Sequence, residues 1–335
     1  MTLTLGYYSD ITQHTPTEAL ENAIKAEKAG FDSVWTSDHF HPWVHTNANC
    51  GFAWVWLGAL GQKTSSLLMG TGLTAPTLRY HPAIVAQAFA TLENMYPNRI
   101  FLAVGTGEAM NELPLGLKWP PFKERAERLE EAVKLMRLLW TKEFTSFRGK
   151  YYRLSKANLY TKPKKPIPVY IAANGPTTAE IAGRLADGLL TAPFPDSHYS
   201  DVLFPALKRG AERAGRDPSK IEKLIELQVS YDADYDSAVK NARWWAPTAM
   251  PIFFKAPISD PREIESYGKL VSDEALQSAW FISDSLDDHI KNIERYIKLG
   301  FRNIHLQSSS PHDLDFISDF GKKVLPYIRD TYGIT

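Results

Sequence analysis

The chain has 335 residues, and its 38 Lys and Arg residues balance 38 Asp and Glu residues, so neither a nucleic acid nor an anionic membrane surface is an expected partner. The single cysteine, Cys50, excludes an internal disulfide framework and a cysteine-rich metal site, and it suits a reducing, cytoplasmic location. The N-terminus lacks the basic and apolar regions of a signal peptide, and no apolar run approaches the roughly 18 residues of a membrane span.

Short apolar runs alternate with helical patterns along the chain. After a first predicted strand, Thr15-Pro16 followed by Glu18 is typical of a helix start, and Gly30 is expected to end that helix. The clearest helix is predicted over 123–140, where apolar residues recur at intervals of three and four. The predicted strands are 3–8, 33–36, 67–71, 100–104, 168–172, 188–191, 223–229 and 303–306.

This alternation predicts an α/β fold with a parallel sheet covered by helices. Eight strands favour a closed (β/α)₈ TIM barrel, and the alternative, an open doubly wound sheet, lacks the expected Gly-x-Gly-x-x-Gly after the first strand. We expect a single domain over 1–335. The segments 141–166 and 232–280 break the rhythm and are predicted insertions on the substrate side, the first of them a hairpin.

Polar residues directly after strands carry the most weight, because active sites of such barrels form where the strands end. His39 follows the second strand and is a candidate proton acceptor, with Asp38 beside it to hold a ligand or orient a neighbour. A structural loop is the alternative. The spacing of His39 and His41 also suits zinc or iron, but the later strand ends offer alanine, threonine and glutamine, so no metal is expected.

Two further strand ends have features of a ligand site. The glycines of 105–107 would let a ligand approach the backbone, and burial would raise the pKa of Glu108 and keep it protonated. Taken alone, Glu108 is slightly better explained as an acid at a helix start. After the fifth strand, 172–178 leads into a helix N-terminus that suits a phosphate, although an ordinary turn has the same pattern. The tryptophans within 43–56 suggest an aromatic pocket or, more plainly, a bulky core.

Taken together, these segments resemble the luciferase-like superfamily, and within it the dehydrogenases that depend on coenzyme F420, a deazaflavin. The resemblance runs nearly from end to end, and the combination of its motifs is far more specific than any one of them. The segments that carry it are Ser37-Asp38-His39-Phe40-His41-Pro42-Trp43, the run from Arg79-Tyr80-His81-Pro82 to Ala90-Thr91, Tyr96-Pro97-Asn98-Arg99, and Val104-Gly105-Thr106-Gly107-Glu108-Ala109-Met110-Asn111-Glu112.

The resemblance implies a hydride transfer from an alcohol carbon to C5 of the coenzyme. His39 would accept the alcohol proton, Trp43 would form an aromatic wall, and Glu108 would be the acid near N1 of the ring. It also implies a non-proline cis peptide between Gly72 and Leu73, where a plain bend is the alternative. The residues that it assigns to the coenzyme are Asp38, Gly72, Leu73, Gly107, Asn111, Ala173, Asn174, Gly175, Pro176 and Thr177, the last three of them at the phosphate.

The substrate is where the resemblance divides. The family's sugar-phosphate enzyme holds its substrate phosphate with two lysines and an arginine, and ungapped local matching puts Phe194, Lys255 and Ala279 at those positions. One lysine would compensate a buried dianion poorly. We therefore expect a small neutral secondary alcohol, with glucose 6-phosphate as the alternative. The residues predicted to contact the substrate are Trp43, Phe194, Trp245, Phe253 and Lys255.

Three other functions stay open at this point. A methylene-tetrahydropterin reductase would use the same coenzyme with a pterin, and a flavin monooxygenase of the same barrel type would bind FMN. A protein that binds the deazaflavin without catalysis is the third, and it is disfavoured because a base, an acid and a phosphate loop all occur at strand ends. The family further implies a homodimer.

Overall fold

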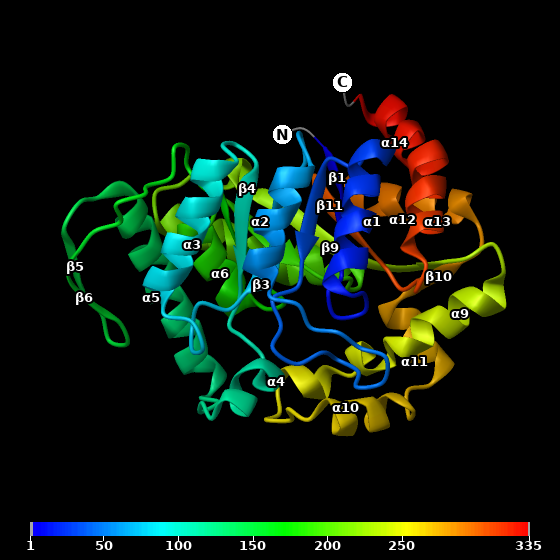
Figure 1. The fold of residues 1–335 in the computed structure, drawn as a ribbon, viewed down its shortest axis with the longest axis horizontal. Helices are drawn as coiled ribbons and strands as arrows, with labels where there is room; N and C mark the ends of the chain where they lie inside the picture. The colour runs from blue at the N-terminus through cyan, green and yellow to red at the C-terminus, as the bar shows by residue number, and fades with distance from the viewer. Residues whose placement is uncertain (1–2, 334–335) are drawn as a thin grey trace.

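The computed structural model describes residues 3–333 and contains a closed barrel of eight parallel strands (Figure 1). Neighbouring strands pair in the order β1-β2-β3-β4-β7-β8-β9-β11, and β11 pairs with β1 to close the ring. The TIM-barrel prediction is therefore confirmed. The barrel strands are β1 (Thr4–Tyr8), β2 (Ser33–Thr36), β3 (Leu68–Thr74), β4 (Ile100–Val104), β7 (Val169–Ala172), β8 (Gly188–Thr191), β9 (Glu222–Tyr231) and β11 (Asn303–Ser308).

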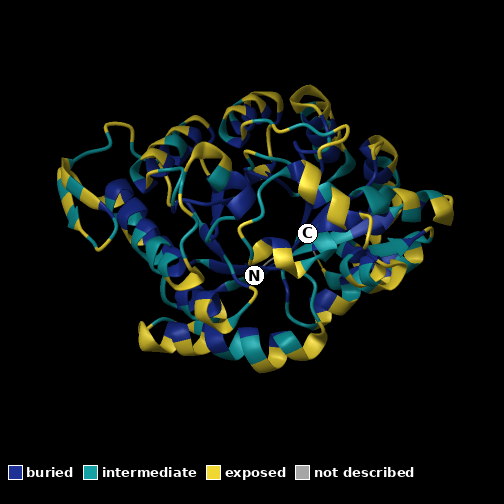
Figure 2. Ribbon diagram, turned by 90° about the horizontal axis from the view of Figure 1, so that it is seen from below, coloured by how far each residue is buried: buried dark blue, intermediate teal, exposed yellow. Residues whose placement is uncertain are grey.

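Helices follow the strands and surround the barrel, with their exposed residues on the outer side (Figure 2). No helix within 3–333 is both long enough and apolar enough to cross a membrane. The α-helices are α1 (Pro16–Ala29), α2 (Ala53–Lys63), α3 (Pro82–Met95), α4 (Ala109–Glu112), α5 (Phe122–Thr141), α6 (Pro176–Leu185), α7 (Asp196–His198), α8 (Phe204–Arg213), α9 (Tyr235–Trp244), α10 (Pro261–Gly268), α11 (Asp273–Ala279), α12 (Leu286–Lys298), α13 (Asp313–Asp319) and α14 (Leu325–Tyr332).

Local sequence signals explain where these elements begin and end. Thr15 caps α1 in a reciprocal capping box with Glu18, and Gly30 ends the helix with a φ of 97°. A ninth strand, β10 (Phe281–Ser283), was not predicted. It pairs with the last three residues of β9, and such a short strand leaves no periodic pattern in the sequence.

The two segments that interrupt the predicted rhythm have different structures. The segment 141–166 contains the predicted hairpin, β5 (Thr145–Arg148) and β6 (Arg153–Ala157), paired antiparallel. The segment 232–280 folds into α9, α10, α11 and two short helical turns between α9 and α10. In Figure 1 these helices lie at the same end of the molecule as α4, which follows the carboxyl end of β4.

Apolar side chains fill both the inside of the barrel and the layer between strands and helices. Inside, Trp35 stacks on His305 with ring centroids 3.7 Å apart, and Phe101, Tyr170 and Leu224 are buried near them. The expectation of an aromatic pocket from the tryptophans of 43–56 holds only in part. Of that group, Trp54 and Trp56 belong to α2 and pack against the main core, because a helix on the barrel surface needs a bulky inner face.

Helices α6 and α8 approach each other through two glycines. A Cβ at Gly183 would lie 2.1 Å from the carbonyl oxygen of Leu207, and a Cβ at Gly210 would lie 2.1 Å from that of Glu180. Backbone atoms cannot move aside as the end of a side chain can. The close packing of these two helices therefore depends on the missing side chains.

We expect Gly183→Ala to lower the free energy of unfolding by about 1–3 kcal/mol, because the added methyl group overpacks the α6–α8 contact. Gly58→Ala is the matched control, since Gly58 is also inside a helix and a Cβ there would meet nothing within 4 Å. The control should be neutral or slightly stabilising, since alanine favours helix. Thermal and denaturant unfolding measure both, and equal stability of the two variants would contradict the packing argument.

Candidate active site

His39 lies in the loop after β2 with one ring nitrogen already engaged. Its Nδ1 is 3.1 Å from the carbonyl oxygen of His41, and because a carbonyl can only accept, Nδ1 carries the proton. Nε2 is then the nitrogen with the free lone pair. Burial lowers the pKa of His39 below its ordinary value, so the neutral imidazole is favoured at neutral pH. The side chain can therefore accept a proton at Nε2.

Glu108 faces that nitrogen from the end of β4, where it is the N-cap residue of α4. Its Oε2 lies 3.5 Å from Nε2 of His39. Burial raises the pKa of Glu108 to about 7, and the opposing attraction of Arg79 and Arg125 does not cancel that effect. Near neutral pH a neutral imidazole thus faces a carboxyl that is only partly ionised.

The side chain of Asn111 joins the two loops that carry this pair. Its Oδ1 accepts hydrogen bonds from the backbone N–H groups of Phe40 and His41, and its Nδ2 donates to Glu108 Oε2 at 3.2 Å. The residue is buried. Asn111 was predicted to contact the coenzyme, and in the structure its amide positions the acid and the His39 loop.

Asp38 forms a buried ion pair with Arg79. The guanidinium Nη2 lies 3.0 Å from Asp38 Oδ1 and also donates to the Asp38 carbonyl oxygen. Thr74 and Tyr80 donate their hydroxyl hydrogens to the same carboxylate at 2.7 and 3.0 Å. The carboxylate is thus held by three side chains from β3 and the loop after it.

A second uncharged carboxyl lies behind this pair. Burial raises the pKa of Glu112 to about 7, and its Oε2 accepts the backbone N–H of Arg79 at 2.8 Å. Arg125 of α5 donates to the carbonyl oxygen of Gly107 at 3.2 Å, and Gly107 has a φ of 83°. These contacts fix the glycine loop that ends in Glu108.

The peptide between Gly72 and Leu73 is cis, as predicted, and the alternative of a plain bend is wrong. The Gly72 carbonyl oxygen accepts a hydrogen bond from the Tyr8 hydroxyl at 3.2 Å. The side chain of Leu73 packs with the residues inside the barrel, and a Cβ at Gly105 would lie 2.7 Å from it.

The loop after β7 leaves a helix N-terminus open. Gly175 is the N-cap of α6, and no side chain caps the helix there. Pro176 and Thr177 form its exposed first turn, while Ala173 is buried and Asn174 accepts a hydrogen bond from Thr191. Free N–H groups at such a helix start attract a phosphate.

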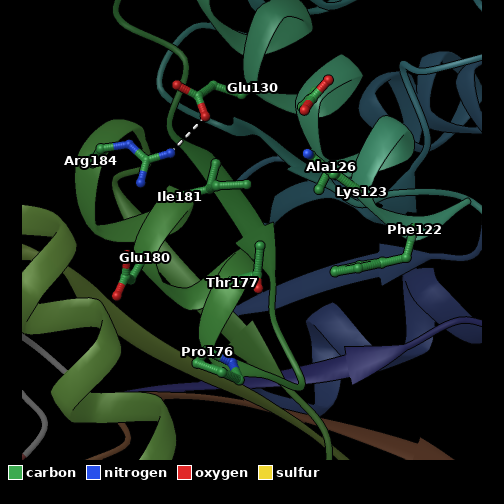
Figure 3. A pocket seen from close by; sticks show the side chains of 10 residues that line it. Phe122, Lys123, Ala126, Glu130, Pro176, Thr177, Glu180, Ile181 and Arg184 are labelled. Atoms are coloured by element: carbon green, nitrogen blue, oxygen red, sulfur yellow. Dashed lines mark hydrogen bonds and ion pairs between the residues drawn. The ribbon is translucent and has the colours of Figure 1, made fainter.

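A groove of about 420 Å³ continues from this helix start along α5 and α6 (Figure 3). It is lined by two basic side chains, Lys123 and Arg184, and three acidic ones, Glu127, Glu130 and Glu180. Arg184 donates to Glu130 at 2.6 Å, drawn as a dashed line. The groove carries no excess of positive charge, so anion binding in this region depends on the N-terminus of α6.

The segment 232–280 supplies an aromatic wall to the site. Trp43 packs against Phe253 and Phe254, with ring centroids 6.4 and 5.2 Å away. Trp245 and Phe253 are 1% and 2% exposed, so these two predicted substrate contacts offer little surface of their own, and they belong to the same buried cluster as Trp43, which is 7% exposed. Phe194 packs instead with His198 and Tyr199, and Lys255 is exposed.

Comparison with known proteins shows the family to which this chain belongs. Residues 3–303 match the family described as luciferase-like monooxygenase. The chain belongs to the luciferase-like monooxygenase family. A relative from Nakamurella multipartita, an F420-dependent glucose-6-phosphate dehydrogenase, is 43% identical over 98% of this chain and 97% of its own length.

Two solved structures are similar to this chain, one closely in sequence and fold and one in fold alone. An F420-dependent secondary alcohol dehydrogenase in complex with an F420-acetone adduct matches with a TM-score of 0.94 and 43% identity, over 98% of this chain and all of that one. The coenzyme F420-dependent tetrahydromethanopterin reductase from Methanopyrus kandleri has a TM-score of 0.80 over 98% and 99% of the two chains, at 21% identity, and shows the fold alone.

Two members of this luciferase-like site were not assigned from the sequence. Arg79 was noted only as part of a motif, and Glu112 only as the end of one. An arginine or a glutamate usually lies on the surface, so the sequence gives no sign that these two are buried. The signal that does exist is position, because each lies in the segment that follows a barrel strand.

We expect Glu108→Gln to gain stability relative to the wild type as the pH rises from about 5 to about 8. A carboxyl whose pKa is raised by folding costs stability once the pH exceeds its unfolded pKa, and the cost is complete above the folded value of about 7. Glutamine has no proton to lose.

Glu18→Gln is the control of opposite sign. The hydrogen bonds from Thr15 lower the pKa of Glu18, so its ionised form stabilises the fold and the variant should lose stability relative to the wild type as the pH rises to about 5, with little change above that. Thermal melting at about pH 3, 5 and 8 measures the response of both variants. If both variants respond to pH in the same direction, the assignment of an uncharged Glu108 is wrong.

Proposed function

We propose that this protein is an F420-dependent secondary alcohol dehydrogenase that removes a hydride from the CH–OH carbon of a small neutral alcohol. The observation that carries the proposal is the facing pair of His39 and Glu108, in which the nitrogen with a free lone pair lies 3.5 Å from a carboxyl whose pKa is raised to about 7. The similarity to two kinds of F420-dependent dehydrogenase, each at 43% identity, supports the coenzyme.

The residues at the barrel mouth fit a deazaflavin coenzyme with a phosphate. The uncapped first turn of α6 is open, and a Cβ at Gly175 would meet nothing within 4 Å. Gly175, Pro176 and Thr177 would hold the phosphate, while Gly107, Asp38 and the cis peptide at Gly72 would lie around the ring. When bound, the coenzyme supplies a ring carbon that accepts a hydride.

The chain's own part in the chemistry is proton movement and orientation. Nε2 of His39 accepts the hydroxyl proton as the C–O bond gains double-bond character, and the His41 carbonyl keeps Nδ1 protonated throughout. The carboxyl of Glu108 holds a proton that the reduced coenzyme can receive. Trp43 covers the substrate side and excludes water, with Phe253 and Phe254 packed against it.

The choice between a neutral alcohol and a sugar phosphate depends on three positions. Phe194 and Ala279 have no charge, and Lys255 is exposed. A phosphate dianion taken out of water needs several charge-assisted hydrogen bonds, and one exposed lysine supplies little of that. The aromatic wall at Trp43 favours an uncharged substrate. Glucose 6-phosphate is the second candidate because the relative from Nakamurella multipartita is named for it.

We expect His39→Ala to lower kcat/KM for a secondary alcohol by a factor of about 100 to 10,000, with little change in coenzyme binding. Anaerobic loss of the visible absorbance of F420 measures turnover, and quenching of its fluorescence measures binding. Loss of binding in parallel with turnover would place His39 in coenzyme recognition and contradict its role as the base.

The wild-type enzyme should show a bell-shaped pH dependence of kcat/KM in alcohol oxidation. Activity rises as His39 loses its proton, at a pKa below its ordinary value, and falls as Glu108 ionises at about 7. Glu108→Gln should lose the alkaline limb because glutamine does not titrate. An alkaline limb that persists in the variant would assign it to another group.

A substrate panel separates the two candidate activities. Secondary alcohols such as 2-propanol and 2-butanol should reduce F420, and glucose 6-phosphate should not. The double variant Phe194→Lys with Ala279→Arg restores the charges of the phosphate-binding enzyme and should gain activity on glucose 6-phosphate. Wild-type turnover of sugar phosphates alone would overturn the preference for neutral alcohols while leaving the dehydrogenase chemistry intact.

A further inference from the structure

One half of the barrel mouth has polar side chains that the proposed mechanism does not use. The predicted coenzyme residues follow β2, β3, β4 and β7, whereas β8, β9, β11 and β1 form the opposite half. On β9, Glu226 and Gln228 alternate with buried apolar residues and share their face with Leu224, which packs inside the barrel. Strand register places Glu226 beside His305 of β11 and Gln228 beside Gln307.

Two acidic residues in this half of the barrel, Asp10 in the loop after β1 and Glu226 on β9, differ in the number of hydrogen bonds that they accept. Asp10 accepts three hydrogen bonds, two from the backbone and hydroxyl of Thr12 at 2.6 and 2.5 Å and one from Gln307 at 3.1 Å. Glu226 accepts one, from Gln228 Nε2 to its Oε1 at 3.1 Å. Within residues 3–333 its second oxygen has no protein partner, and the side chain is only half-buried. Glu226 can therefore still bind a ligand.

The charge state of Glu226 decides which ligand it suits. Burial raises its pKa to about 8, and the nearby Asp10 and Glu108 raise it as well. At neutral pH the carboxyl is mostly uncharged, so it can both donate and accept a hydrogen bond. A hydroxyl group is the chemical complement of that pattern, whereas a cation or an anion is not.

We propose that Glu226 binds a second hydroxyl of the substrate, across the barrel mouth from His39, so that the preferred substrates are alcohols with two hydroxyl groups rather than plain alkanols. This inference rests on the proposed alcohol dehydrogenase function and narrows its substrate class. His39 would receive the hydroxyl that is oxidised and Glu226 the one that is not. Attachment at two points would fix which carbon and which hydrogen face the coenzyme.

The physical reason for discrimination is the cost of an unpaired polar group. A site that hydrogen bonds a substrate hydroxyl rejects the analogue that lacks it, because its own polar group is then left without a partner. Glu226 is half-buried, so water can replace the lost partner in part. The expected preference is therefore about 10-fold to 100-fold, below the largest values known for fully enclosed sites.

The experiment compares 2-butanol with 2,3-butanediol and 1,3-butanediol, which share one carbon skeleton. The wild-type enzyme with F420 should oxidise at least one diol with a kcat/KM about 10-fold above that of 2-butanol. Glu226→Leu should remove this preference by raising KM for the diol, while kcat/KM for 2-butanol and the Kd for F420 stay within about twofold. Glu226→Gln keeps both hydrogen-bonding functions and should retain most of the preference.

Glu222→Gln is the matched control, since Glu222 lies on the same strand, four residues toward its start, and already accepts a hydrogen bond from the Tyr170 hydroxyl. It should leave the diol preference unchanged.

An equal loss for both alcohols in Glu226→Leu, or a weaker Kd for F420, would overturn the proposal and make Glu226 a structural or coenzyme residue. A wild type that oxidises no alcohol would instead overturn the proposed function itself. If only sugar phosphates react, the same comparison is made with glucose 6-phosphate and its 2-deoxy analogue.

Discussion

The amide of Asn111 is the contact on which the geometry of the proposed reaction depends. Loops after two different strands carry the base and the acid, and neither loop has regular structure to hold it. One side chain spans the gap, with its oxygen on the backbone of Phe40 and His41 and its nitrogen on Glu108. Since Asn111 belongs to the short helix that Glu108 caps, the bond also ties the acid to its own helix. The 3.5 Å separation of His39 and Glu108 follows from this link.

The pKa values of the titratable groups around Asn111 are set by burial and by the positive charge of Arg79, which offsets the effect of burial on the carboxyls only in part. Arg79 is committed to Asp38 by a direct ion pair, and from there it lowers the pKa of His39, Glu108 and Glu112. For the two carboxyls burial outweighs this attraction, whereas for the imidazole both effects act in the same direction. The result near pH 7 is a neutral imidazole beside a carboxyl that is only partly ionised, a combination that suits the proposed oxidation of an alcohol. One buried guanidinium thus helps to adjust several groups without touching a substrate.

The sequence predicted the barrel well because each of its strands is a short apolar run between helix signals. All eight barrel strands were located to within a few residues, and the ends of α1 follow from Thr15, Glu18 and Gly30. The cis bond at Gly72 came from the family resemblance and had no signal of its own in the residues. Position after a strand made His39 and Glu108 candidates, although Glu108 taken alone was better explained as an acid at a helix start, and barrel closure brings the two to 3.5 Å. The sequence could not predict which side chains, distant from one another along the chain, contact each other in the fold. Neither the pairing of Arg79 with Asp38, across 41 residues, nor the burial of Trp245 between other tryptophans has a local pattern.

The surroundings of Glu226 could not be predicted from the sequence either. In the sequence it is one of three charged residues in its strand, and an acid facing the solvent would look the same. Only closure of the barrel buries it close to Asp10, and burial together with that negative charge raises its pKa, so that the carboxyl keeps its proton. Glu108 beside His39 and Glu226 on β9 are thus two carboxyls of raised pKa at the barrel mouth, and they differ in position. The contacts of Glu108 with Asn111 and His39, and that of Glu226 with Gln228, each involve one carboxyl oxygen. Only Glu108 lies beside the imidazole of His39, which fits the proton transfer proposed for it, and the hydroxyl recognition proposed for Glu226 rests on its second oxygen.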